Sequence, residues 1–378
     1  MKTRKVVYAA SLDPITNGHL NVIERFAPLY DEFIVVVAVD ARKTYMFTPE
    51  ERVSMTKSAV AHISNVTVDV CIGRYVVKYA ESVGAQVIIR GLRNFKDLED
   101  EQVLAEENRR ICSTIETIWV PCLPNLMHIS SSMVKGHVGI DPDWEEQVVR
   151  SVPSIVVTKL KEKYMLNRAK KHWASLMALL GNPKGSELVF AELLLKYSEP
   201  HRAYHTLEHV VNMLDELESV VDKLNDKDAV KMAVWYHDVV YDPMTKDHHV
   251  VADNEVRSAY RAELDLEKLG LSSNFSERVQ ALIMATTHTE KVTDSDTMFM
   301  VDLDLAILGK SEKEFESYEK GIRKEYDWVS EADFCVGRSK VLESFLNRET
   351  VYSTEVFRSR YENTARKNME KSLTLLKQ

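Results

Sequence analysis

Several residues near the N-terminus have the types and spacing expected of a site that handles phosphate. Ser11, Thr16, Gly18 and His19 come between a short β-branched run and an amphipathic stretch. A helix that starts here would offer unpaired N–H groups and the positive end of its dipole to a phosphate. Gly18 would let the backbone approach the ligand closely, and His19 could donate a hydrogen bond to a phosphoryl oxygen. A capped helix start without a ligand would give a similar pattern.

Two later segments offer the same kind of chemistry. Ser130, Ser131 and Ser132 stand about one helical turn before Lys135 and predict a second helix start rich in hydroxyl groups. An N-cap serine with two bystanders would look the same. The sequence RGLR at positions 90–93 ends another β-branched run, and its guanidinium groups are forked donors suited to phosphate oxygens. Three such segments at three strand ends are hard to explain by helix capping alone.

The C-terminal half carries a different constellation, made of histidines and aspartates. His205 and His209 lie four residues apart, which places both on one face of a helix. His237 and Asp238 end an apolar stretch, and an Asp-Leu-Asp sequence follows at 302–304. Imidazole and carboxylate ligands together suit Mn²⁺, Fe²⁺, Zn²⁺ or Mg²⁺ and leave positions for water and phosphate. The pattern therefore predicts a divalent metal site, with the choice between the last two aspartates open.

The elements that must position these residues change character along the chain. In residues 1–160, β-branched runs alternate with amphipathic stretches, which predicts an α/β, Rossmann-like parallel sheet covered on both faces. The expected strands are 6–10, 33–39, 66–72, 87–89 and 115–120, and the expected helices include 21–30, 49–63 and 76–83. Ligands of such sheets sit at the carboxyl ends of the strands. Helical periodicity dominates residues 168–378, which predicts an all-α domain with a buried helix at 230–236.

Length and composition set outer limits on function. The chain has 378 residues, 45% of them hydrophobic, which suffices for two cores without a metal or disulfide staple. Its net charge of −9 argues against a nucleic-acid binder. The four scattered cysteines and the lack of a signal-like N-terminus favour a cytoplasmic protein. No apolar run is long enough to span a bilayer, so no membrane partner is expected.

Taken together, the three N-terminal segments resemble the nucleotidyltransferase superfamily, whose signatures are T/HxGH and ISSS. More narrowly, RGLR, the acidic run DLEDE at 97–101 and FTPEERV at 47–53 resemble bacterial phosphopantetheine adenylyltransferase over about residues 4–160. The resemblance implies transfer of an adenylyl group from ATP, bound with Mg²⁺, to 4′-phosphopantetheine. The products would be dephospho-CoA and pyrophosphate. Because members of that family form hexamers, the resemblance also implies a homo-oligomer.

The same resemblance assigns roles to individual residues. Those expected to hold the nucleotide are Ser11, Thr16, Gly18, His19, Gly91, Arg93, Glu101, Ser130, Ser131 and Ser132. Those expected to bind the acceptor are Ser11, Lys43, Val76 and Arg90. The attacking phosphate is already anionic, so no general base is required. His19, Lys43 and Ser130 are then expected to stabilise the charge that develops in the transition state. Residues 126–132 are expected to close over ATP.

Three positions depart from the pattern of that family. Ala9-Ala10 stands where Pro-Gly is usual, residues 126–128 replace the aromatic side chains before ISSS, and Gly136 replaces a glutamate. The methyl group of Ala10 would crowd a phosphate or reshape the acceptor pocket. Two alternatives therefore stay open. One is an adenylyltransferase with another acceptor, and the other is a nucleotide-sensing or assembly module that serves the C-terminal domain.

The C-terminal half resembles the HD superfamily of metal-dependent phosphohydrolases over residues 168–378. The resemblance rests on YHTLEH at 204–209, WYHDVVYD at 235–242, NE at 254–255, DLDLAILG at 302–309 and IRKEY at 322–326. It implies metal ligands at His209, His237, Asp238 and Asp304, with Asp302 as the alternative to Asp304. It also implies that His205 protonates the leaving oxygen, that Arg202 binds phosphate, and that Glu255 and His288 support this metal or a second one. The expected substrate is a small phosphorylated molecule that the sequence does not name.

Overall fold

The structure is a computed structural model that describes residues 3–141, 143–243, 253–288 and 292–377. The chain divides into two compact units, Met1–Tyr164 and Met165–Gln378. The division lies within helix α7, Ser154–Leu179, in the same stretch where the change of sequence character suggests a boundary. Each unit has its own apolar core, so each is described by itself.

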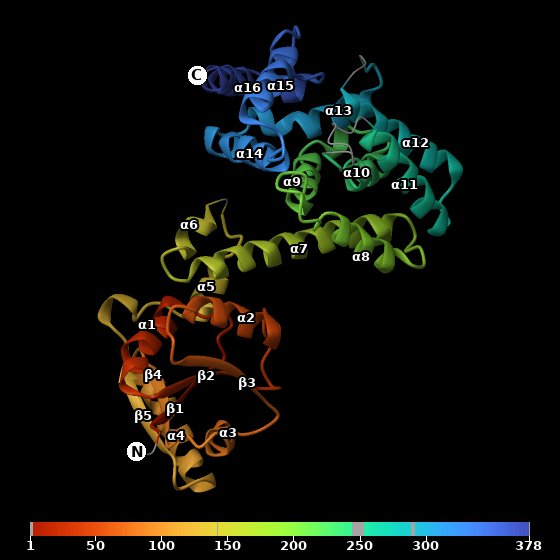
Figure 1. The fold of residues 1–378 in the computed structure, drawn as a ribbon. Coiled ribbons are helices and arrows are strands. Elements are labelled where there is room, and N and C mark those ends of the chain that lie inside the picture. The colour runs from red at the N-terminus through yellow and green to blue at the C-terminus, as the bar shows by residue number, and fades with distance from the viewer. Residues whose placement is uncertain (1–2, 142, 244–252, 289–291, 378) are drawn as a thin grey trace. The chain divides into compact units, whose positions relative to one another are not determined.

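A five-stranded parallel sheet forms the centre of the first unit (Figure 1). Its strands are β1 Lys5–Ala10, β2 Glu32–Val39, β3 Val66–Ile72, β4 Val87–Leu92 and β5 Glu116–Pro121. The order across the sheet is β3-β2-β1-β4-β5, and every neighbouring pair is parallel. The carboxyl ends of β1 and β4 therefore flank the topological switch point, where ligands bind in such sheets. The prediction of a Rossmann-like parallel sheet is confirmed.

Helices cover both faces of this sheet, as strands that are apolar on both sides require. They are α1 Asn17–Phe26, α2 Pro49–Val60, α3 Val76–Ser82, α4 Phe95–Ile111, α5 Ser131–His137 and α6 Trp144–Val148. Alternate residues of β1 serve different cores, because Val6 and Tyr8 belong to one apolar cluster and Val7 and Ala9 to another. Figure 1 shows α1 and α2 on one face of the sheet and α3 and α4 on the other.

Two elements of the first unit differ from the predicted bounds. Strand β4 extends beyond 87–89 as far as Leu92, so Arg90 and Gly91 belong to the strand and not to the loop after it. Pairing with β5 explains the extension, since Gly91 stands opposite Val120 and Leu92 opposite Pro121. Glycine lowers strand propensity, and the sequence alone therefore suggests an earlier end. Helix α1 begins at Asn17 with Thr16 as its N-cap, in line with the helix start expected at the first motif, and it ends at Phe26 and not at residue 30.

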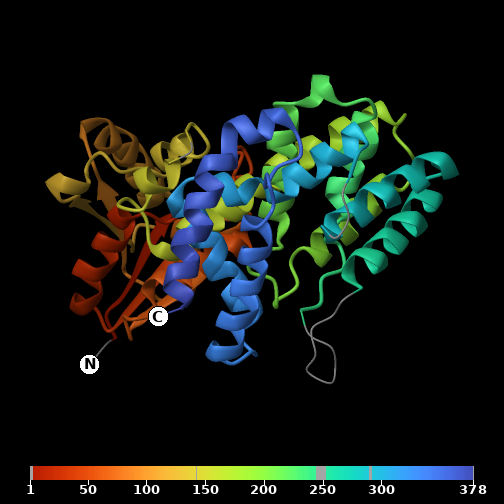
Figure 2. The same ribbon diagram turned by 90° about the horizontal axis from the view of Figure 1, so that it is seen from above.

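The described residues of the second unit form helices, 3-10 turns and loops, with no strand among them. After α7 its helices are α8 Ser186–Lys196, α9 Leu207–Glu218, α10 Lys227–Tyr236, α11 Asn254–Lys268, α12 Ser273–Met284, α13 Ser295–Asp304, α14 Glu312–Glu325, α15 Glu331–Leu346 and α16 Glu355–Leu376. Helices α11 and α12 pack side by side, as do α15 and α16 (Figures 1 and 2). The prediction that this part is helical is confirmed.

Helix α10 is the buried helix that the sequence predicts, and its C-terminal end leads into His237. Apart from Lys231, its side chains from Ala229 to Tyr236 are buried. Trp235 packs edge-on against Trp173 and Phe190 in the core. None of the helices that the structure describes combines the length and apolar character that a bilayer span requires.

Candidate active site and metal centre

The loop between β1 and α1 holds His19 in one protonation state. The backbone N–H of Thr16 donates a 3.0 Å hydrogen bond to His19 Nδ1. Because Nδ1 accepts this bond, the proton of the neutral imidazole lies on Nε2. Burial, together with the positive charges of Arg93 and Arg90, lowers the pKa of His19 to about 4. His19 is therefore neutral at pH 7, with Nε2–H as its hydrogen-bond donor.

The two arginines of RGLR lie at the carboxyl end of β4, and each is paired with a carboxylate of α4. Arg90 Nε lies 2.7 Å from Glu101 Oε2, and the same guanidinium also donates to the second oxygen of Glu101 and to the carbonyl of Ala9. Arg93 makes two contacts with Asp97, of 2.9 Å and 3.0 Å. Carboxylates of α4 thus already orient both arginines that the sequence suggests as phosphate ligands. The partner of Arg90 is Glu101, which is itself one of the residues predicted to bind the nucleotide.

The serine segment joins the first motif at the start of α5. Ser130 is the N-cap and accepts a 3.0 Å hydrogen bond from the backbone N–H of Met133. Ser131 Oγ donates to the carbonyl of Pro14 over 2.8 Å, which ties α5 to the loop after β1. Ser132 is exposed. The structure therefore brings the serine segment next to the loop after β1, and it leaves the hydroxyl group of Ser132 facing solvent.

Asp13 is a further organising residue of this edge, and the sequence reasoning did not single it out. Its buried carboxylate accepts hydrogen bonds from the backbone N–H groups of Met46 and Phe47, at 3.1 Å and 2.9 Å. Its third partner is Lys135 Nζ, at 2.6 Å. Asp13 thus connects the loop after β1, the loop after β2 and helix α5. In the sequence, the role of Asp13 is indicated only by its place immediately before Pro14 in the first motif.

Three predicted ligands are less closely tied to this group. Lys43 is exposed in the loop after β2, and within the described part of the chain its side chain makes no hydrogen bond or ion pair. Val76 begins α3 and packs against the apolar cluster on the α3 face of the sheet. Gly18 has room for a methyl group, which would meet Thr16 Oγ1 at 3.6 Å, so internal packing does not require glycine there.

In the second unit, the predicted metal ligands converge. His209 Nε2 lies 3.1 Å from His237 Nε2, and Asp304 Oδ1 lies 3.3 Å and 3.6 Å from these two nitrogens. Asp238 Oδ2 lies 3.0 Å from His237 Nε2 and 3.7 Å from His209 Nε2. Both histidines are buried. Two imidazole nitrogens and two carboxylate oxygens at this spacing form a donor set that fits a divalent ion.

Electrostatics at this cluster favour a positive charge. Burial alone would lower the pKa of His237, but Asp238 and, more weakly, Asp304 raise it to about 9. Burial likewise disfavours ionisation of Asp304, yet hydrogen bonds with His209 and His288 and the charge of His237 hold its pKa well below the usual range. The charges of His237 and His205 also lower the pKa of Asp238 against the effect of burial, so both carboxylates remain ionised at neutral pH, as metal ligation requires.

The structure separates the two aspartates of the Asp-Leu-Asp sequence. Asp304 lies in the cluster, and its other oxygen, Oδ2, contacts His288 Nε2 at 2.9 Å. Asp302 points elsewhere, because its carboxylate accepts hydrogen bonds from the backbone N–H groups of Ser353 and Thr354, both at 2.7 Å. Asp302 thus fixes the start of α16, and His288 orients the carboxylate of Asp304.

His205, the predicted proton donor, is held by Glu325, whose role the sequence did not reveal. His205 Nδ1 lies 2.7 Å from Glu325 Oε2, and its ring stacks on Tyr241 with 4.1 Å between centroids. Burial would lower the pKa of His205, but Asp238 and Glu325 raise it overall. Burial also opposes ionisation of Glu325, yet its hydrogen bond with His205 lowers the pKa of Glu325 to about 2. The contact with Glu325 therefore favours the protonated form of the His205 imidazole beside the cluster.

The structure does not support the prediction that Arg202 binds substrate phosphate. Its side chain is buried, and every N–H of its guanidinium has a partner within the protein. Nη1 donates to the carbonyls of His205 and Asp238, at 2.9 Å and 2.8 Å. Nη2 donates to the carbonyl of Val239 at 3.1 Å, and Nε and Nη2 both contact Glu199 at 3.2 Å. With no donor left for a phosphate, Arg202 supports the backbone around the cluster.

Glu255 lies at the start of α11 and is half-buried. Burial, followed by the negative charges of Asp238 and Asp304, raises the pKa of Glu255, so the carboxylates of the cluster act on it electrostatically.

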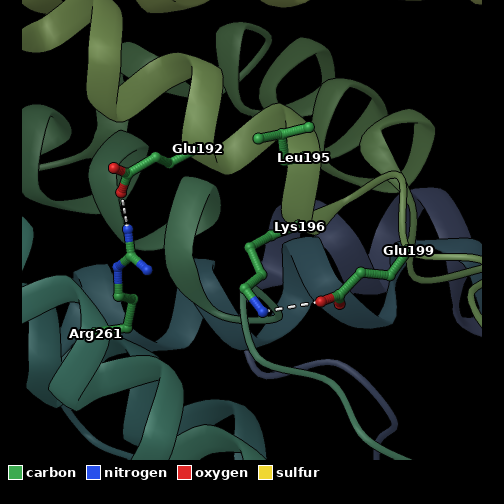
Figure 3. A pocket seen from close by; sticks show the side chains of 5 residues that line it. All are labelled: Glu192, Leu195, Lys196, Glu199 and Arg261. Carbon is green, nitrogen blue, oxygen red and sulfur yellow. Dashed lines mark hydrogen bonds and ion pairs between the residues drawn. The ribbon is translucent and has the colours of Figure 1, made fainter.

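A separate surface cleft of about 440 Å³ is lined by Glu192, Leu195, Lys196, Glu199 and Arg261 (Figure 3). None of the predicted metal ligands lines this cleft, and its charged groups pair with each other, Arg261 with Glu192 and Lys196 with Glu199.

Comparisons with known proteins concern the N-terminal unit. Residues 7–137 match the family described as cytidylyltransferase-like. The phosphopantetheine adenylyltransferase of Bdellovibrio bacteriovorus is 41% identical over 157 residues, which cover 42% of this chain and 95% of that protein. The enzyme of the same name from Heliobacterium modesticaldum is 38% identical over 158 residues, covering 42% and 91%.

Among solved structures, the nicotinic acid mononucleotide adenylyltransferase of Plasmodium falciparum aligns with 44% of this chain and 96% of that one. Its sequence identity is 16% and its TM-score is 0.32. The curated relatives align over nearly their whole length at 36–41% identity. Through its N-terminal domain, this chain belongs to the phosphopantetheine adenylyltransferase family of nucleotidyltransferases.

Proposed function

We propose that the N-terminal domain transfers the adenylyl group of ATP to 4′-phosphopantetheine. An oxygen of the 4′-phosphate attacks the α-phosphorus of ATP, the bond to the β-phosphate breaks, and pyrophosphate leaves with its electron pair. The attacking oxygen is already anionic, so rate acceleration comes from positioning and charge stabilisation. The observation that carries the proposal is the alignment with relatives of this name over more than nine-tenths of their length, together with the three strand-end motifs of this sequence.

The geometry of the carboxyl edge supports this chemistry. Neutral His19 has an Nε2–H donor for a phosphoryl oxygen, and Lys43 is exposed without a partner among the described residues. Arg90 is held by Glu101 at the end of β4, beside the switch point of the sheet. We expect substrate phosphates to bind between these side chains, with Mg²⁺ carried by ATP.

The experiment is dephospho-CoA formation by the full chain with ATP, Mg²⁺ and 4′-phosphopantetheine, followed by liquid chromatography and mass spectrometry. The proposal predicts product with the wild-type protein and a large loss with His19→Ala. No product at saturating substrates would refute it. Ala9-Ala10 favours a second candidate, an adenylyltransferase with another acceptor. Calorimetry separates the two, because tight binding of 4′-phosphopantetheine would reject the second candidate.

For the C-terminal domain we propose a metal-dependent phosphohydrolase of the HD type. The observation that supports it is the convergence of His209, His237 and Asp304, whose ligand atoms lie within 4.8 Å of one another, with Asp238 beside them. A divalent ion bound there would supply Lewis acidity and an activated water. The protein's own contribution is a protonated His205, oriented by Glu325, that donates its Nε2 proton to the leaving oxygen.

A phosphate-release screen of small phosphorylated metabolites with Mn²⁺-loaded protein tests this second activity. We expect hydrolysis of at least one nucleotide or phosphate ester, and none with Asp238→Asn. The N-terminal domain also has a non-catalytic alternative, a sensing or assembly module whose family resemblance implies hexamers. His19→Ala distinguishes them, since a sensor predicts altered regulation of hydrolysis and two independent enzymes predict unchanged hydrolysis.

A further inference from the structure

Arg52 is a wholly buried cation at the functional edge of the N-terminal domain. It lies on α2, and none of its side chain is exposed to solvent. In the part of the chain that the structure describes, Arg52 makes no ion pair, and its Nε and Nη2 atoms have no hydrogen-bond partner. A buried charge without a counter-ion is unfavourable by itself, so its presence calls for a compensating interaction.

The other buried arginines of the described chain show what compensation normally looks like. Arg202 contacts the carboxylate of Glu199 at 3.2 Å, and Arg338 contacts that of Glu319 at 3.2 Å. In the loop after β1, the buried carboxylate of Asp13 is paired with Lys135 and not with Arg52. Arg52 is therefore the exception among these buried arginines, and it lies at the sheet edge where the proposed substrates bring negative charge.

The contacts that Arg52 does make reach both loops at this edge. Its Nη1 donates to the carbonyl of Ser11, after β1, at 2.8 Å, and to the carbonyl of Ala38, in β2, at 3.4 Å. Its guanidinium lies 4.0 Å from the ring centroid of Tyr45, whose hydroxyl accepts a hydrogen bond from the backbone N–H of Asp40. Asp40 and Tyr45 bracket Lys43, so Arg52 supports the loop that carries it.

We propose that Arg52 is a positioning residue for adenylyl transfer, which orients the Ser11 and Lys43 loops and supplies a positive charge that the protein leaves uncompensated for the substrate phosphates. The inference rests on the proposed function and adds to it a residue that the sequence reasoning did not assign. Because its guanidinium nitrogens are buried, Arg52 does not touch the substrate. It acts by holding the two loops and through the electrostatic attraction between its charge and the substrate phosphates.

The test is calorimetric titration of the full chain with pyrophosphate, the proposed product. Arg52→Gln keeps an amide donor for Ser11 but removes the charge, and we expect roughly tenfold weaker binding. Arg52→Lys keeps the charge but cannot hold both carbonyls and the ring, so binding should stay near the wild-type value while kcat falls. Arg4→Met is the control, because Arg4 is exposed before the amino end of β1, and its loss should change neither quantity.

The outcomes separate this proposal from the proposed function. Wild-type binding by Arg52→Gln, or tenfold weaker binding by a folded Arg52→Lys, would overturn the role of the charge. Circular dichroism checks folding, and if Arg52→Gln does not fold, Arg52→Lys decides alone. A wild-type chain that binds pyrophosphate but makes no dephospho-CoA would refute the proposed acceptor, while the titrations would still test Arg52.

Discussion

Replacing Glu325 by glutamine should loosen the segment that carries His205. Glu325 is buried, and its Oε1 accepts hydrogen bonds from three consecutive backbone N–H groups, those of Ala203, Tyr204 and His205, at 2.7, 2.7 and 2.9 Å. Its Oε2 contacts His205 Nδ1 at 2.7 Å and accepts from Tyr241 at 3.1 Å. A glutamine keeps the shape, but it removes the charge and places an NH₂ group where one of the two acceptors stood.

Two estimates of the cost agree. Lowering the pKa of Glu325 from 4.5 to about 2 corresponds to roughly 3 kcal/mol, at 1.36 kcal/mol per pH unit. Weakening hydrogen bonds to three buried N–H groups, at about 1 kcal/mol each, also gives roughly 3 kcal/mol. The sign follows from the lowered pKa, since the stabilisation is present above pH 4.5 and is lost as the pH falls toward 2.

Hydrogen exchange with mass spectrometry on the full chain is the assay, because it reports on the amides of residues 203–205 directly. In Glu325→Gln we expect the free energy of opening at these amides to fall by about 3 kcal/mol at pH 7, roughly a hundredfold faster exchange. Glu316→Gln, a change on the exposed face of the same helix, is the control and should alter it by less than about 0.5 kcal/mol. Unchanged exchange in Glu325→Gln would refute the reasoning.

Three further predictions follow from the buried contacts. Arg202→Met leaves three backbone carbonyls without donors and should destabilise the C-terminal unit by about 3 kcal/mol in urea titrations, whereas a phosphate-binding Arg202 would change only KM. By NMR, His19 should titrate near pH 4, and its neutral imidazole should carry the proton on Nε2. Because the folded pKa is lowered, the free energy of unfolding should rise with pH between about 4 and 6.5. Titration of His19 near pH 6.5 would contradict this prediction. Asp302→Asn should cost about 1–3 kcal/mol in urea titrations and leave Mn²⁺ binding intact.

The strand–helix alternation of the N-terminal domain could be read from the sequence because each strand is a continuous β-branched run between amphipathic segments. Each of the three motifs follows a predicted strand, and the carboxyl ends of parallel strands lie at one edge of the sheet. The motifs could therefore be placed at that edge from the sequence. What the sequence could not show is how the side chains pair once they meet. Arg90 and Glu101 were expected to bind different ligands, yet they contact each other.

The cluster around His209 and His237 shows the same limit. Asp302 and Asp304 are two residues apart on a helix, about 200° around its axis, so one of them must point away from the site. Only the partners at the start of α16 show that Asp302 is the one that does. The sequence could not show the surroundings of Arg202, because its partners include the backbone carbonyls of Asp238 and Val239, which residue types do not reveal. Glu325 lies 120 residues from His205, beyond the reach of any spacing argument.

The most direct test of the central claim is the metal stoichiometry of the full chain, measured by equilibrium dialysis against Mn²⁺ and elemental analysis. If one site is formed by His209, His237, Asp238 and Asp304, the wild-type protein should bind about one Mn²⁺ ion per chain at saturation. His237→Ala and Asp304→Asn should abolish this binding. Mn²⁺ binding at wild-type affinity by Asp304→Asn, or none by the wild-type chain, would contradict the account.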